Sequence, residues 1–132
     1  MIDIEAKVFS PIYTALKNQY DGIYVTSEPA PIPSMPLAVS IVQQDSFSSP
    51  RMQDNTLQEK YITVMFQVDV YCNLQTGKKS KCKEVLGVVD DMLFKQNFMR
   101  LSLTPIPMEE HGYYRLTARY RAMTDGETFY RT

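Results

Sequence analysis

The feature that most constrains the fold is a long run of alternating side chains between Glu59 and Asn73. A period of two is typical of a β-strand with one buried face and one partly exposed face. From Tyr61 to Cys72 the run would span about 40 Å, which is long for a domain with a radius of gyration near 14 Å. The sequence therefore predicts a strand that either bends at a bulge or projects beyond the domain. Its apolar face comprises Ile62, Val64, Phe66, Val68, Val70 and Cys72.

Other patterns place two helices and several shorter strands around this run. A helix is predicted from about residue 3 to residue 20, with a kink or restart at Pro11 and an apolar face of Phe9, Ile12, Tyr13, Leu16 and Tyr20. A second helix is predicted over 78–95. Strands are predicted over 22–27, 37–43, 98–107 (fraying at its prolines), 113–123 and 128–131. Four prolines make 28–36 a stiff connector, and 45–58 reads as a long polar loop.

This order predicts a single α+β domain over residues 1–132. We expect a mainly antiparallel sheet with two helices on one face, a long polar loop and a projecting β-hairpin.

Composition excludes several classes of protein. The 132 residues carry 14 Lys and Arg against 15 Asp and Glu, and this balance argues against a protein built mainly to bind nucleic acid. No run of 18 apolar residues is present, so no membrane-spanning helix is expected.

Catalytic and metal-binding patterns are missing from the sequence. His111 is the single histidine and lies in a predicted turn, and Cys72 and Cys82 fall on core-facing positions as expected for buried thiols. We therefore expect no enzymatic activity, no cofactor and no metal.

The most suggestive surface pattern is a stripe of arginines. Arg115, Arg119 and Arg121 share the face of the last long strand that lies opposite its core positions. They either cover a solvated sheet face with their stems, or they contact an acidic partner surface or nucleic acid. The formal net charge of -1 favours a protein partner over DNA. Tyr61 and Tyr71 occupy the corresponding face of the longest strand, and tyrosine is suited to interfaces. Asp90 and Asp91, on the polar face of the second helix, could supply the opposite charge.

Three stretches resemble the small tail proteins of long-tailed phages and prophages of Gram-positive bacteria. They are Val-Asp-Val-Tyr-Cys-Asn-Leu-Gln-Thr-Gly-Lys-Lys-Ser-Lys-Cys-Lys-Glu-Val from residue 68, Val-Val-Asp-Asp-Met-Leu from residue 88, and Tyr-Arg-Leu-Thr-Ala-Arg-Tyr-Arg-Ala from residue 114. The order and spacing of these stretches cover most of residues 60–123. The family comprises tail terminator, tail completion and minor capsid proteins.

The resemblance implies a structural virion protein of the tail or neck, made in the cytoplasm of the bacterial host. Tail terminators form a ring, usually a hexamer, that caps the tail tube, ends its polymerisation and meets the head–tail connector. The implied partners are copies of the chain itself, the tail tube protein and the connector or stopper protein, and DNA passes through the lumen without specific binding. By position, the loop that is often mobile before assembly in this family corresponds to 45–58, with Ser46, Phe47, Pro50, Arg51 and Asn55.

We accordingly expect Arg115, Arg119 and Arg121 to contact a neighbouring subunit or the tail tube. Charge reversal of all three is expected to abolish ring formation and leave the monomer folded. Two other functions stay open. One is a head-completion or stopper protein, and the other is a nucleic-acid-binding module that uses Lys78, Lys79, Lys81 and Lys83.

Overall fold

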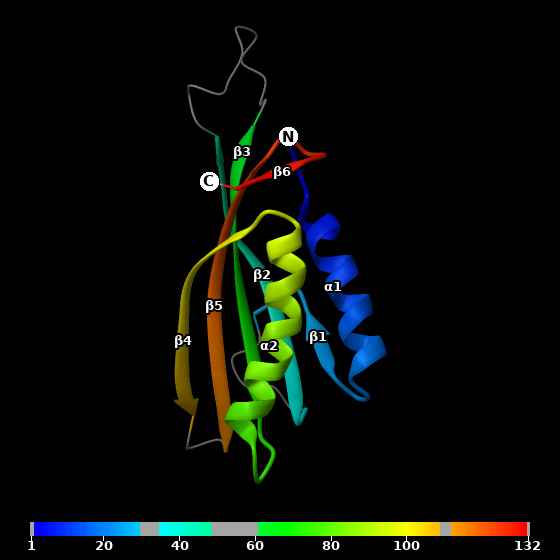
Figure 1. The fold of residues 1–132 in the computed structure, drawn as a ribbon, viewed down its shortest axis with the longest axis vertical. Coiled ribbons are helices and arrows are strands. Elements are labelled where there is room, and N and C mark those ends of the chain that lie inside the picture. The colour runs from blue at the N-terminus through cyan, green and yellow to red at the C-terminus, as the bar shows by residue number, and fades with distance from the viewer. Residues whose placement is uncertain (1, 30–34, 49–60, 109–111, 132) are drawn as a thin grey trace, which may run out of the picture.

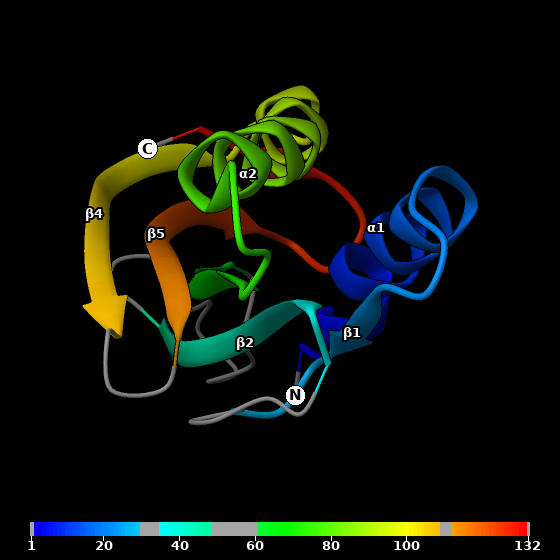
Figure 2. The same cartoon turned by 90° about the horizontal axis from the view of Figure 1, so that it is seen from below.

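The computed structural model describes residues 2–29, 35–48, 61–108 and 112–131. Within these ranges a mostly antiparallel sheet carries both helices on the same face, which confirms the expected α+β class (Figures 1 and 2). The helices are α1 (Glu5–Gln19) and α2 (Lys78–Lys95), and the strands are β1 (Tyr24–Thr26), β2 (Leu37–Ser48), β3 (Ile62–Cys72), β4 (Met99–Met108), β5 (Tyr113–Thr124) and β6 (Phe129–Tyr130).

The strands lie in the order β1-β2-β3-β5-β4, and β6 pairs with the far end of β5. The β1–β2 pair is parallel and all the other pairs are antiparallel. β4 and β6 both lie on the side of β5 away from β3. The described sheet therefore has β1 along one edge and β4 with β6 along the other.

β3 is the strand predicted from the alternating run, and each of its six predicted core residues is buried. Its partner β2 is longer than expected. Asp45–Ser48, predicted as the start of a loop, continues β2 and pairs with Ile62–Met65 after a bulge between Gln43 and Asp45. Strand pairing uses backbone groups. The polar residues Asp45–Ser48 have little strand preference of their own, but β3 offers them backbone hydrogen-bond partners, and they therefore continue β2.

The ends of β2 and β3 that pair near Ser48 and Ile62 extend beyond both helices (Figure 1). This placement agrees with the predicted projecting hairpin. The chain that connects the two strand ends lies outside the described residues.

α1 is one continuous helix, and no restart occurs at Pro11. Its buried face also differs from the prediction. The buried residues follow a spacing of four through Ile4, Val8, Ile12, Leu16 and Tyr20. Phe9 is partly buried and Tyr13 is 39% exposed. These two rings pack on each other with centroids 5.6 Å apart.

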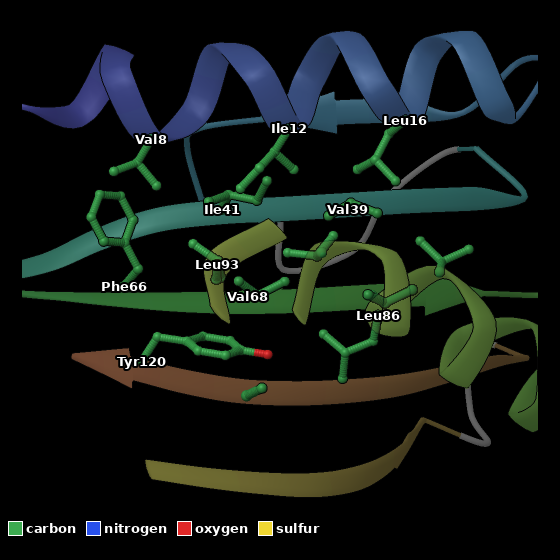
Figure 3. Close-up of a cluster of buried hydrophobic side chains, with 14 of the residues drawn as sticks. Val8, Ile12, Leu16, Val39, Ile41, Phe66, Val68, Leu86, Leu93 and Tyr120 are labelled. Atoms are coloured by element: carbon green, nitrogen blue, oxygen red, sulfur yellow. The ribbon is translucent and has the colours of Figure 1, made fainter. Parts of the chain in front are cut away.

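α2 begins and ends at the predicted residues and buries Cys82, Val85, Leu86, Val89 and Leu93. The core forms where these side chains meet those of α1 and the inner face of the sheet, as Figure 3 shows for Ile12, Leu93 and Phe66. Phe98 extends the core, since its ring lies 5.7 Å from that of Phe66 and 5.4 Å from that of Phe129.

β4 runs without interruption through Pro105 and Pro107, so the predicted fraying does not occur. Proline has no backbone N–H and is accepted in a strand whose outer side needs no donor. The position of β4 at the sheet edge supplies that condition.

Candidate functional site: the uncovered face of the sheet

The candidate site is the face of the sheet that neither α1 nor α2 covers (Figure 2). Cross-strand register places Tyr71, Asp69, Gln67 and Met65 of β3 beside Arg115, Thr117, Arg119 and Arg121 of β5 on this face. The sequence analysis assigned these β5 positions to the side opposite the core. The core-facing partners Leu116, Ala118, Tyr120 and Ala122 are buried, which confirms that assignment.

At the centre of the face, Arg115 and Asp69 form an ion pair. The Nε of Arg115 donates to Oδ1 of Asp69 over 2.9 Å, and Gln67 Nε2 donates to Oδ2 of the same carboxylate over 2.9 Å. Gln44 Nε2 in turn donates to Gln67 Oε1. The Asp69 side chain is only 7% exposed and that of Arg115 is 25% exposed. The pair is therefore largely shielded from water, where its charges interact more strongly than at an open surface.

Tyr71 completes this cluster. The guanidinium carbon of Arg115 lies 5.5 Å from the centroid of the Tyr71 ring, a cation–π distance. Burial and the nearby charge of Asp69 raise the pKa of the Tyr71 hydroxyl, although Arg115 opposes them. For Arg115, burial disfavours the charged form, but the hydrogen bond and charge of Asp69 outweigh it and raise the guanidinium pKa. The cluster thus keeps a neutral phenol beside a permanent ion pair.

A pocket of about 280 Å³ opens over these residues. Its lining includes Pro29, Ser40 and Val42 from the β1–β2 side, together with Gln44, Gln67, Asp69, Tyr71 and Arg115. The Asp69 carboxylate already accepts from two side chains, so the pocket floor is a satisfied polar network.

Arg119 and Arg121 differ from Arg115 in their surroundings. Arg119 is exposed, and no ion pair is found for it among the described residues. Arg121 is half-buried between β3 and the start of β4, opposite Met65 and Met99. Within the stripe, Arg115 is therefore held in an ion pair of the folded chain, and Arg119 presents an exposed charge.

The shielded position of Arg115 changes the expected effect of reversing the charge of all three arginines. Charge reversal at Arg115 would place a carboxylate against Asp69 in a shielded position, and it would then destabilise the monomer. A triple reversal cannot separate loss of assembly from loss of folding.

Asp90 and Asp91 lie on the other side of the molecule from the arginine stripe. Asp90 Oδ1 accepts a hydrogen bond from the Tyr120 hydroxyl over 2.7 Å and lies 3.4 Å from Nη1 of Arg100. Burial and this bond to Asp90 raise the pKa of Tyr120. Asp91 is exposed on α2. Asp90 therefore anchors β5 and β4 to the helix, and only Asp91 of the pair is open to a partner.

The two tyrosines predicted to lie at an interface have different surroundings. Tyr71 is 2% exposed and packs in a small cluster with Ala38, Tyr113 and Met108, so little of its side chain is open to a partner. The Tyr113 hydroxyl of this cluster also donates to the Met35 carbonyl over 2.8 Å. Tyr61 is half-buried, with its ring 6.1 Å from that of Tyr130.

The predicted assembly loop is only partly described. The backbones of Ser46 and Phe47 belong to β2 and not to a loop. Pro50, Arg51 and Asn55 lie outside the described residues.

Sequence reasoning missed the role of Asp69. A signal was available, because aspartate is depleted in strands and one placed mid-strand needs a compensating partner. The sequence analysis also missed the exposed apolar side chains near β4, namely Phe94 at 61%, Leu101 at 40% and Leu103 at 43% exposure.

No known family model matches the chain, and no curated protein matches it. Among the described residues there is no group of three or more His, Cys, Asp or Glu side chains arranged to hold a metal ion. None of the described helices is both long and apolar enough to span a membrane.

Proposed function

We propose that this chain is a structural subunit of a phage tail, of the tail-terminator type, which assembles into a ring that caps the tail tube and joins it to the head. The resemblance over residues 60–123 supplies the family. The structural observation that supports it is the uncovered polar sheet face, on which the exposed Arg119 has no ion-pair partner among the described residues.

The chemistry proposed is binding without catalysis. A protein that ends tube growth has to contact copies of itself, the tube and the connector at once, and arginine and tyrosine are favoured at such contacts. A rigid α+β domain supplies fixed surfaces for this purpose. In this role the chain works in the tail or neck of the virion and is assembled in the host cytoplasm, and DNA passes through the ring without specific contacts.

The test compares assembly of the wild-type chain with that of Arg119→Glu. Light scattering over a concentration series, with negative-stain images, should show a wild-type ring near six times the 15.2 kDa of one chain, alone or after addition of purified tail tubes. The Arg119→Glu variant should stay monomeric and fail to cap tubes, while its circular dichroism is unchanged because Arg119 is exposed.

The matched control is Lys79→Glu. It makes the same change in charge at an exposed position of α2. It should assemble as the wild type does. A wild-type chain that binds neither itself nor tail tubes would contradict the proposal, and binding to a head connector but not to tubes would favour a stopper protein.

A further inference from the structure

We infer that the ring is closed by contact between the two opposite edges of the sheet. The β4/β6 edge of one subunit lies against the edge of the next subunit formed by β1 and the start of α1. This inference rests on the proposed ring and names the surfaces that build it. It follows from the strand register, the charges and the shapes of the two edges.

The strands at the two edges match in direction and in their position along the strand axis. β1 runs parallel to β2, and the three antiparallel steps through β3 and β5 to β4 make β4 antiparallel to β1. A neighbour added side by side therefore continues the antiparallel order. Following the register across the sheet, Thr26 shares a row with Thr117 and Thr104, and Arg119 with Ser102 lies about two residues further along. The chain turns after Thr26, and the Glu28 carbonyl accepts a hydrogen bond from Ser40 Oγ, so Glu28 lies beside the row of Thr26 and Ser40. A neighbour in the same register therefore brings Glu28 within about two residues of Arg119 along the strand direction.

The two edges carry opposite charges. Asp21 and Glu28 bracket β1, and both are exposed with no ion pair among the described residues. Toward the other edge, Arg119 is exposed on β5, one strand in from β4, and Arg131 follows directly after β6. An exposed acid and an exposed base that face each other across a subunit contact favour head-to-tail over head-to-head association.

The shapes of the edges are also complementary. A hollow of about 400 Å³ lies between the start of α1 and the residue after β1, and its lining includes Asp3, Glu5, Lys7 and Ser27. On the opposite edge, Phe94 at the end of α2 is 61% exposed, and the guanidinium of Arg131 lies 4.4 Å from its ring centroid. The start of α1 and the end of α2 lie at the same end of the molecule (Figure 1). The Phe94–Arg131 pair therefore lies at the same end as this hollow of the next subunit, whose lining carries two carboxylates and one lysine.

Because the contact joins two different patches, it is heterologous. Such contacts build rings when the rotation between subunits closes, whereas a two-fold pair of β4 edges would stop at a dimer. The exposed Leu101 and Leu103 of β4 would be covered in the contact.

Cysteine cross-linking tests which edges meet. Ser27→Cys and Ser102→Cys each add one thiol at a partly exposed or exposed position and leave Glu28 in place, and the native Cys72 and Cys82 are buried. With a short bifunctional maleimide, a mixture of the two variants should give a cross-linked dimer, and each variant alone should not. The double variant should give a ladder of larger species. Leu74→Cys mixed with Ser102→Cys is the control, since Leu74 is exposed in the turn before α2, away from both edges.

A charge swap provides an independent measurement. Arg119→Glu and Glu28→Arg should each reduce the ladder at least fivefold, and the chain that carries both substitutions should recover it. Strong cross-linking of Ser102→Cys with itself, or no dimer in the mixture, would overturn the inference. A ring in micrographs without the mixed cross-link would refute the edge contact and leave the proposed function intact. The mixed cross-link without binding to tail tubes would support the edge contact and contradict the proposed function.

Discussion

The Asp69–Arg115 pair leads to the sharpest prediction about stability. Substitution Asp69→Ala removes the carboxylate that accepts from both Arg115 and Gln67. The guanidinium then stays close to the Tyr71 ring without its counter-charge. Breaking a buried ion pair by removal of one partner typically costs about 3–5 kcal/mol. The Arg115 side chain is 25% exposed, so water recovers part of this cost and we expect a loss of about 2–3 kcal/mol.

A double-mutant cycle isolates the interaction from the loss of packing. Arg115→Met alone leaves the buried carboxylate with only Gln67 as a donor, and it should cost about as much as Asp69→Ala. Asp69→Ala combined with Arg115→Met removes both charges, so neither is left without its partner, and it closes the cycle with the two single variants. The double variant should therefore be more stable than Arg115→Met alone, with a coupling energy of about 2 kcal/mol.

The assay is urea denaturation at pH 7, followed by far-ultraviolet circular dichroism. Asp91→Ala serves as the matched control, because Asp91 is an exposed carboxylate with no ion pair among the described residues, and it should change the free energy of unfolding by less than about 0.5 kcal/mol. The reasoning is refuted if Asp69→Ala behaves like this control, or if the losses of the two single variants simply add in the double variant.

Three further predictions concern the core, a turn and alkaline pH. Phe66→Ala empties a fully buried site and should lower the free energy of unfolding by about 3–5 kcal/mol in the same assay; a smaller loss than 1.5 kcal/mol, roughly that of one buried methyl group, would contradict the packing. Gly77→Ala forces a side chain into a backbone with φ of 75° and should cost about 1–2 kcal/mol, whereas Gly87→Ala, inside α2 with open space around it, should not destabilise. Burial raises the pKa of the Cys82 thiol from 9.0 to about 12, so the unfolded chain loses this proton first and stability falls as pH rises above about 9. At pH 10.5 the expected loss from this group is about 2 kcal/mol relative to pH 8, and Cys82→Ala should show a shallower fall; equal pH profiles would exclude the thiol as the cause.

The sequence alone determined the elements whose pattern is both strong and local. The alternation before Cys72 identified β3 and its core face, and the spacing of apolar residues identified α2 with its bounds. The same alternation assigned Leu116, Ala118 and Tyr120 to the core side of β5 and the arginines to the other side. These inferences succeed because burying one face of an element needs only its own periodicity and a water-excluding partner of any kind.

The tertiary structure decided what depends on pairing between distant segments. β2 extends to Ser48 because β3 supplies the backbone partners, and Tyr71 is buried because Ala38, Tyr113 and Met108 pack around it. The arginine stripe illustrates the same limit. Periodicity places Arg115 and Arg119 on one face, but only the strand register puts Asp69 beside Arg115 and leaves Arg119 exposed. Charge partners across a sheet are fixed by register, which no local pattern encodes, because each strand's alternation is satisfied equally well by any shift of two residues.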